Sequence, residues 1–111
     1  MDIPKLTPLF RRVLEKARGY LVKGWVQGLY AADAEGKACD PWSERAAQWC
    51  INGALIRAEK DLDVGDMKGR GVEELLEAKI GGMRLSKWQD IPTRTRSDVL
   101  ELVDSVLREG K

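Results

Sequence analysis

Few residues in this 111-residue sequence could do chemistry, and the first to consider are its two cysteines, Cys39 and Cys50. The sequence has no histidine, which is the commonest general base and the commonest metal ligand in proteins. A cysteine nucleophile would then need activation by a lysine or by a helix dipole. Cys50 is expected on the apolar face of a helix, where core packing explains it. We therefore predict no catalytic residue, no metal site and no cofactor, and we do not favour an enzyme.

A polar, glycine-rich segment, residues 61–71, is the strongest loop signal in the sequence. Its glycines do not have the spacing of a phosphate-binding loop. Lys68 and Arg70 precede the next predicted helix, whose free N–H groups could attract an anion. A solvated loop explains the same residues, and we prefer that interpretation.

The four tryptophans are many for a short chain: Trp25, Trp42, Trp49 and Trp88. Each ring buries a large area and usually needs a hydrogen-bond partner for its N–H group. We expect two or three of them to pack between helices. Trp42 and Trp49 are seven residues apart in a predicted helix and so share one face. If that pair is exposed, it forms a partner-binding surface or the seam of a dimer.

The charge is balanced overall but unevenly placed. The chain has 19 basic and 18 acidic residues, a net charge of +1, which does not favour nonspecific binding to nucleic acid. Residues 1–30 carry six basic and two acidic side chains, and the rest of the chain carries 13 basic and 16 acidic ones. We expect the basic first helix to pair with the acidic remainder. A weaker alternative is contact with nucleic acid through Arg11, Arg12, Lys16 and Arg18.

The elements that must position these residues follow from hydrophobic spacing and from helix start and stop signals. A first helix is predicted between a Thr7-Pro8 cap and Gly24, which would end it at a positive φ. Asp40-Pro41 predicts the start of a second helix, which fades near residues 61–63. Gly53 within that helix costs about 1 kcal/mol, and a close packing contact is the natural compensation.

Three further segments complete the predicted fold. The spacing from Val72 to Ile80 is that of a third helix, and a short helical turn is expected before Pro92. Thr95 and Asp98 resemble a capping box at the start of the last helix.

We predict a single domain, residues 1–111, of mainly all-α class. It is a compact bundle of three long helices plus one short helix, with a small β-hairpin or an irregular insertion at 25–39. The turn of that insertion is expected at residues 33–36. No apolar run is long enough to span a membrane, and the N-terminus is unlike a signal peptide. We therefore predict a cytoplasmic protein with no membrane contact.

The sequence also carries a set of short motifs. They are Gly24-Trp25-Val26-Gln27-Gly28, Asp33-Ala34-Glu35-Gly36, Trp49-Cys50-Ile51-Asn52-Gly53-Ala54-Leu55, Trp88-Gln89-Asp90 and Arg94-Thr95. Over residues 9–108 this pattern resembles a family of small bacterial and phage proteins of unknown function. The family usually has asparagine where this chain has Gln89. The resemblance implies a mostly helical fold and brings no known activity.

Six of the residues in these motifs are candidates for a common site: Trp25, Gln27, Asp33, Trp88, Asp90 and Arg94. In one interpretation they converge as a polar pocket with aromatic walls. In the other, which we prefer, they are structural. Asp90 then caps the turn before the last helix and pairs with Arg94, and this pair fixes the position of Trp88.

Two classes of function remain open from the sequence. The first is a non-enzymatic binding or regulatory module that acts through a protein partner or as a homo-oligomer. The alternative is a small enzyme or small-ligand binder whose polar pocket is walled by tryptophans. A partner-binding module should expose a contiguous apolar patch around tryptophan. A ligand binder should instead have a concavity on the order of 300 Å³ or more with converging polar groups.

Overall fold

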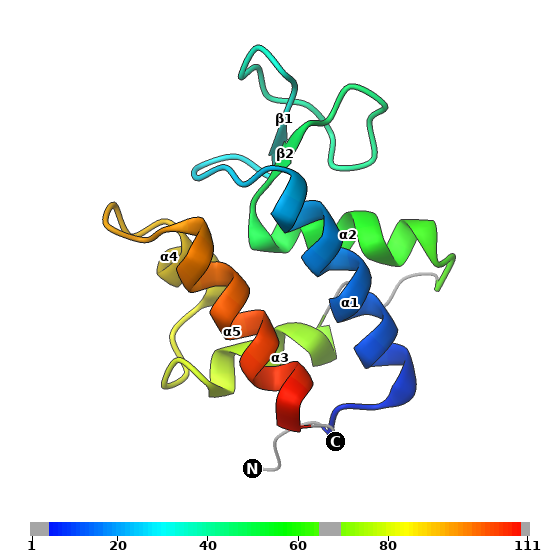
Figure 1. Ribbon diagram of the computed structural model, residues 1–111, viewed down its shortest axis with the longest axis vertical. Helices are drawn as coiled ribbons and strands as arrows, with labels where there is room; N and C mark the ends of the chain where they lie inside the picture. Colours follow the sequence, from blue (N-terminus) through cyan, green and yellow to red (C-terminus); the bar gives the residue numbers. More distant parts are fainter. Residues whose placement is uncertain (1–4, 65–69, 110–111) are drawn as a thin grey trace.

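Five helices and a two-stranded sheet make up the part of the chain that the computed structural model describes, residues 5–64 and 70–109 (Figure 1). In chain order they are α1 (Pro8–Lys23), β1 (Ala31–Ala32), β2 (Gln48–Trp49), α2 (Ile51–Asp61), α3 (Arg70–Ala78), α4 (Leu85–Gln89) and α5 (Arg96–Glu109). The prediction of a mainly helical chain is confirmed. The five described helices do not match the predicted set of three long helices and one short helix. The anion hypothesis for the segment before α3 concerns residues that lie largely outside the described ranges.

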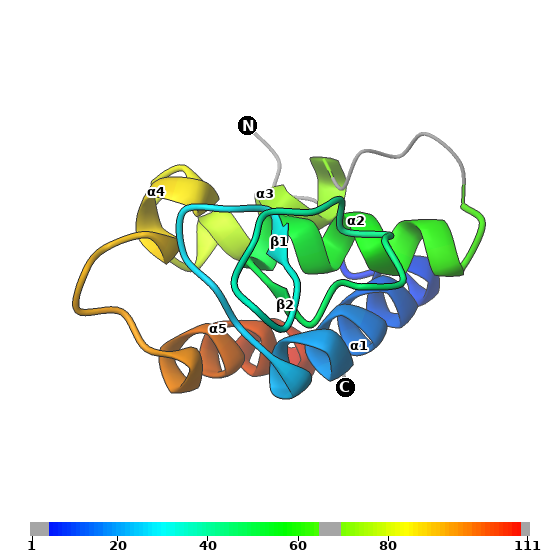
Figure 2. The same cartoon turned by 90° about the horizontal axis from the view of Figure 1, so that it is seen from above.

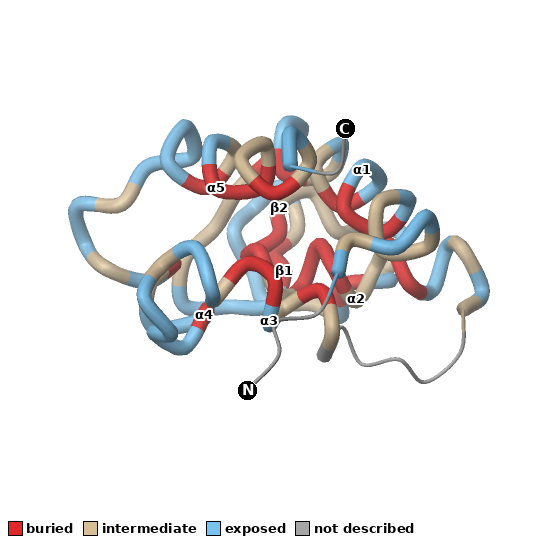
Figure 3. Tube along the Cα trace, turned by 90° about the horizontal axis from the view of Figure 1, so that it is seen from below, coloured by how far each residue is buried: buried red, intermediate tan, exposed pale blue. Residues whose placement is uncertain are grey.

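The helices form two layers with the core between them. Helices α1 and α5 make one layer, and α2, α3 and α4 make the other (Figure 2). The buried stretches of the chain face the space between these layers (Figure 3). Fully buried side chains in this core include Leu14, Leu21, Leu55, Leu76 and Val103. Among the described residues, no helix is both long enough and apolar enough to cross a membrane.

Helix α1 begins as predicted but ends for a different reason. The Thr7 hydroxyl oxygen accepts a hydrogen bond from Phe10 N at 3.0 Å, and Pro8 occupies the first helical position. Gly24 follows the helix with φ −174°, an extended conformation, so the expected positive φ is wrong. A Cβ at Gly24 would lie 2.2 Å from the carbonyl oxygen of Ala47. Glycine is needed here because another backbone passes so close.

The second helix starts ten residues later than predicted. Residues 40–47 form a loop, Gln48–Trp49 form β2, and α2 begins at Ile51 with Cys50 as its N-cap. The backbone of Ala47 donates to the carbonyl of Ala32, and Gln48 pairs with Ala32 in the antiparallel sheet. The small residues of this segment therefore allow a strand to pass close to its neighbours. The close packing contact predicted for Gly53 does form, because a Cβ there would lie 1.9 Å from the carbonyl oxygen of Tyr30.

The insertion after α1 is folded around β1. The turn at residues 33–36 forms as predicted, with Gly36 N donating to Asp33 O at 3.0 Å, and Ala38 returns to bridge with Ala32. The named partner of β1 is β2, in the register Ala31↔Trp49. This pairing joins the insertion to the start of α2 and places both beside α4.

The last helix has the predicted capping box. Asp98 N donates to the Thr95 hydroxyl oxygen at 3.2 Å, and Thr95 N donates to Asp98 Oδ2 at 3.0 Å. Aspartate is therefore long enough to complete the reciprocal pair. At the end of α3 the chain turns through Gly81 and Gly82, whose φ angles are 71° and 83°. The capping box could be predicted because it is a hydrogen-bond pair within three residues, and glycine's backbone freedom allows the turn after α3.

Candidate functional site

A pocket of about 680 Å³ lies where the insertion meets the helices. Its walls come from residues 28–31, Ala38 and Cys39 on one side and from the N-terminal end of α2 on another. Side chains of α3 and α4 complete it. Because these segments are far apart in the sequence, the pocket exists only in the folded chain. No single motif could have revealed it.

A buried glutamine joins the segments below this pocket. Gln89 is 1% exposed, and its Oε1 accepts hydrogen bonds from Trp25 Nε1 at 2.5 Å and from Ile51 N at 2.9 Å. Its Nε2 donates to Val26 O at 3.3 Å and to Asp90 Oδ1 at 2.8 Å. All four contacts come from one side chain. Gln89 therefore connects the segment after α1, the start of α2 and the end of α4.

Two neighbours complete this arrangement, which we call the Gln89 clasp (Trp25, Gln27, Gln89 and Asp90). Gln27 Nε2 donates to the carbonyls of Gln89 and Ile91 at 3.0 and 2.9 Å. Asp90 Oδ1 also accepts from Gly28 N at 3.0 Å. In all of these contacts the side chains of the clasp bond to other parts of the protein. The clasp is therefore a structural element, and two of its members, Gln89 and Asp90, line the pocket.

Arg94 and Trp88 form a separate contact. The Arg94 guanidinium lies over the Trp88 ring, 3.9 Å from its centroid, and Arg94 Nε donates to Trp88 O at 3.1 Å. The charged partner of Arg94 is Asp98, at 4.0 Å, and not Asp90 as the sequence suggested. Asp90 is the C-cap residue of α4, the short helix before α5, and its side chain accepts from Gly28 N. Arg94 still fixes Trp88, but it does so by stacking.

The other predicted site residues lie elsewhere. Asp33 organises the turn of the insertion, where its Oδ1 accepts from Glu35 N and Lys37 N. Trp49 is 3% exposed and its Nε1 donates to Pro41 O at 2.9 Å. Trp42 is 47% exposed in the loop before β2. Because neither tryptophan is helical, the predicted shared helix face does not exist. None of the four tryptophans lines the pocket.

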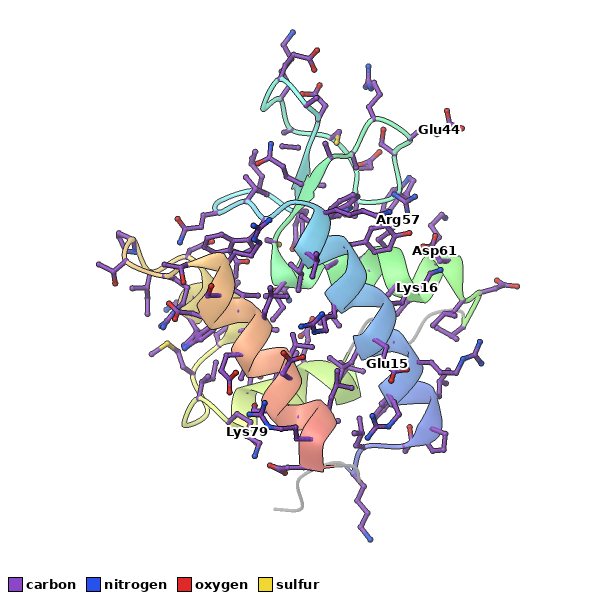
Figure 4. The ribbon with its side chains drawn as sticks, in the orientation of Figure 1. Glu15, Lys16, Glu44, Arg57, Asp61 and Lys79 are labelled. Atoms are coloured by element: carbon purple, nitrogen blue, oxygen red, sulfur yellow. The ribbon has the colours of Figure 1, made fainter. Side chains whose placement is uncertain are left out.

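A cationic side chain fixes the buried tryptophan from outside. The Arg57 guanidinium lies 4.9 Å from the Tyr20 ring centroid and 6.0 Å from that of Trp49. Arg57 also pairs with Asp61, one turn further along α2, with Nε and Oδ1 3.2 Å apart (Figure 4). Trp49, which the sequence analysis considered as part of a binding surface, is therefore packed inside this cluster.

Of the polar residues of the pocket wall, Asp90 was a predicted site residue, whereas Asn52, Glu73 and Glu77 were not. Asn52 Nδ2 donates to Glu73 Oε1 at 3.0 Å, whereas Asn52 Oδ1 is buried and accepts no hydrogen bond within the described structure. Glu77 Oε2 accepts from Leu85 N at 2.8 Å. Glu73 and Glu77 are four residues apart on α3, beside the buried Val72 and Leu76. That spacing was a usable signal, although a solvated helix face has the same pattern.

Two basic side chains of α1 bond to residues of α5. Arg18 forms a bidentate pair with Asp104, at 2.6 and 3.1 Å, and Arg11 donates to the carbonyl of Leu107 at 2.9 Å. Arg12 and Lys16 are exposed. Two of the four side chains considered for nucleic-acid contact are thus bonded to α5. Only Arg18 pairs with an acidic residue there, as predicted for the basic helix.

Cys50 is the N-cap of α2 and a pocket residue, and it is not on an apolar helix face as predicted. Its Sγ accepts from Gly53 N at 3.2 Å. Burial raises the pKa of the Cys50 thiol, and the nearby charge of Asp90 acts in the same direction. The backbone N–H groups at the helix start oppose this shift only in part. The thiol is therefore protonated at neutral pH and is a poor nucleophile.

Iodoacetamide near neutral pH is expected to alkylate Cys39 at least about tenfold faster than Cys50, because only Cys39 is partly exposed and Cys50 stays a buried thiol. Peptide mass spectrometry of time points measures both rates. In denaturant the two rates should converge. Since the folded state holds the Cys50 proton more tightly, the protonated thiol contributes to the stability of the fold. This contribution is complete below the unfolded thiol pKa. It is lost as pH rises through the folded pKa. Faster reaction of Cys50 in the folded protein would contradict this assignment.

Within the described residues, no group of three or more cysteine, aspartate or glutamate side chains is arranged to hold a metal ion. The fold and the pocket thus define a small, mainly helical domain with a ligand-sized cavity that is lined by polar side chains and two thiols. The chain belongs to the family of unknown function DUF6197, whose model matches residues 7–109. This confirms the resemblance to a family without known activity. No curated protein and no solved structure matches the chain.

Proposed function

We propose that this protein is a non-enzymatic binding module that takes a small molecule in the pocket between the insertion, α2, α3 and α4. The observation that carries the proposal is the pocket itself. Its volume of about 680 Å³ lies within the range typical of small-molecule sites. Polar side chains from three helices converge on it, namely Asn52, Glu77 and Ser86. The tryptophan walls of the original hypothesis are not part of the proposal.

The exposed apolar residues give less support to a protein-binding surface. Val22, Trp42 and Met83 are each more than two-fifths exposed, but they belong to three separate segments. Leu29 and Tyr30 are also exposed, and both line the pocket. Their exposed side chains therefore give the pocket apolar surface that a ligand can contact. The proposal also includes the cytoplasmic location and the bacterial or phage origin that the sequence analysis predicts.

A pair of variants on α4 tests the proposal. Ser86 and Lys87 are both exposed, but only Ser86 lines the pocket. Thermal unfolding is followed with a panel of small anions, cations and neutral compounds. A compound present at about ten times its Kd stabilises the fold by about 1.4 kcal/mol, which raises Tm by several degrees. We expect Ser86→Trp to abolish such shifts by filling the pocket, and Lys87→Trp to preserve them. Shifts that are equal in both variants, or absent with every compound, would refute the proposal.

A further inference from the structure

The charged side chains of the pocket are mostly acidic. Glu73, Glu77 and Asp90 line it, whereas Arg84 is the basic residue among the described lining residues. Arg84 is exposed at the start of α4, and it forms no ion pair with these carboxylates in the described structure. Even without Glu73, the carboxylates of Glu77 and Asp90 outnumber this one basic group, and a concave site whose charges are mainly of one sign concentrates ligands of the opposite sign. The pocket therefore favours a cation over an anion.

Two of these carboxylates are held in place by the backbone and lack a cationic partner. Glu77 accepts from Leu85 N through Oε2, and Asp90 accepts from Gly28 N through Oδ1. Glu77 Oε1 and Asp90 Oδ2 take part in no hydrogen bond or ion pair in the part of the chain that is described. Each carboxylate is thus oriented by one oxygen and has the other available. A carboxylate with a fixed position and a free oxygen is suited to accept from a ligand ammonium group.

A helix N-terminus at the pocket would also favour an anion, but several of its N–H groups already bond to the protein. The N-terminus of α2 reaches the pocket, and free N–H groups at such an end attract negative charge. Here Ile51 N donates to Gln89 Oε1, Gly53 N to Cys50 Sγ and Ala54 N to Cys50 O. These donors are not available to a ligand. The helix end therefore gives an anion no hydrogen bonds through them.

The size and the remaining lining define the kind of cation. A cavity of about 680 Å³ is far larger than a bare metal ion, and no described group of ligands is arranged to hold one. Leu29, Tyr30 and Leu85 supply apolar surface beside the carboxylates. We infer that the pocket takes a small organic cation, a primary amine with an apolar body, whose ammonium group donates to the free carboxylate oxygens of Glu77 and Asp90. This inference rests on the proposed function of the pocket.

Two probes with similar bodies and opposite charges test the inference. 2-Phenylethylamine carries an ammonium group, and 3-phenylpropionate carries a carboxylate. Each is titrated into the ¹⁵N-labelled protein, and the backbone amide signals of Gly28 and Leu85 are followed, because those N–H groups bond the two carboxylates. We expect the amine to shift both signals at millimolar concentration and 3-phenylpropionate to shift neither. The amine shifts should weaken as salt is added.

Two glutamate-to-glutamine variants distinguish the effect of a charge in the pocket from the effect of the protein's net charge. Glu77→Gln keeps an oxygen for Leu85 N but removes one negative charge, so the amine Kd should rise about tenfold. Glu44→Gln removes the same charge from the exposed loop between β1 and β2 (Figure 4) and should leave the Kd unchanged within about twofold. Equal effects of the two variants would overturn the inference. So would absence of amine binding up to about 10 mM.

The outcomes also distinguish this inference from the proposed function. If 3-phenylpropionate shifts the pocket signals and Ser86→Trp abolishes those shifts, the pocket binds small molecules but does not select cations. The inference then fails while the proposed function stands. If no compound of the panel shifts the pocket signals, both fail together.

Discussion

Replacing Gln89 with leucine is expected to lower the free energy of unfolding by about 3 kcal/mol, because it leaves buried hydrogen-bonding groups without partners. Leucine has a similar volume, so the loss of packing is small. Ile51 N loses its acceptor at 2.9 Å, and Trp25 Nε1 loses its acceptor at 2.5 Å. Val26 O loses its donor at 3.3 Å. Urea unfolding, followed by tryptophan fluorescence and by far-ultraviolet circular dichroism, measures the change.

Gln48→Leu is the matched control for this prediction. Gln48 is half-buried, and its amide donates a single long hydrogen bond to Asp33 O at 3.4 Å. Its loss should cost less than about 1 kcal/mol. If Gln89→Leu costs no more than Gln48→Leu, the clasp does not have the structural role assigned to it. The comparison also checks whether both probes unfold together, as a two-state transition requires.

The clasp shows what a sequence pattern can and cannot give. The motifs around Trp25 and Gln89 were recognised as a set, and they do meet in space. Their roles could not be read from residue types, because an amide can serve a ligand or a backbone equally well. Only the partners decide between these, and Gln89 bonds to protein groups on both sides of its amide. The sequence hypothesis that preferred a structural role for these residues is the one the geometry favours.

The helix boundaries show a second limit. Thr7, Thr95 and Asp98 were assigned correctly because a cap is a contact within three residues of the chain. Asp40-Pro41 has the same local chemistry, yet no helix follows it directly. The segment after it pairs with β1 through Ala47 and Gln48, contacts that join residues about fifteen apart. Tertiary pairing of this kind overrides a local start signal and leaves no trace in the local spacing.

The pocket was beyond prediction for the same physical reason. Glu77, Asn52 and Cys39 come from three elements whose mutual positions depend on the late start of α2 and on the β1–β2 pairing. With α2 drawn from residue 40, Cys50 falls in mid-helix and its capping role disappears. The error in one boundary therefore concealed the site, even though the prediction of a mainly helical chain was correct.

Gly53 is the position where this tertiary arrangement is most sensitive, and Gly53→Ala is expected to lower the free energy of unfolding by at least about 2 kcal/mol. A Cβ there would lie 1.9 Å from the carbonyl oxygen of Tyr30 and 2.8 Å from its carbon. Both are backbone atoms, which cannot rotate away as a side chain does. The same Tyr30 oxygen accepts from Cys50 N at 3.2 Å, so the shift that relieves the clash breaks a cap contact.

Gly19→Ala is the matched control and should have the opposite sign. Gly19 is an exposed residue within α1, and a Cβ there would meet nothing within 4 Å. Alanine has the better helix propensity, so this variant should gain about 0.5–1 kcal/mol. Urea unfolding of the two variants should therefore give changes of opposite sign. Because Tyr30 lines the pocket, Gly53→Ala should also weaken ligand binding, which Gly19→Ala preserves. Stabilisation by both substitutions would contradict the close approach of the Tyr30 backbone to Gly53.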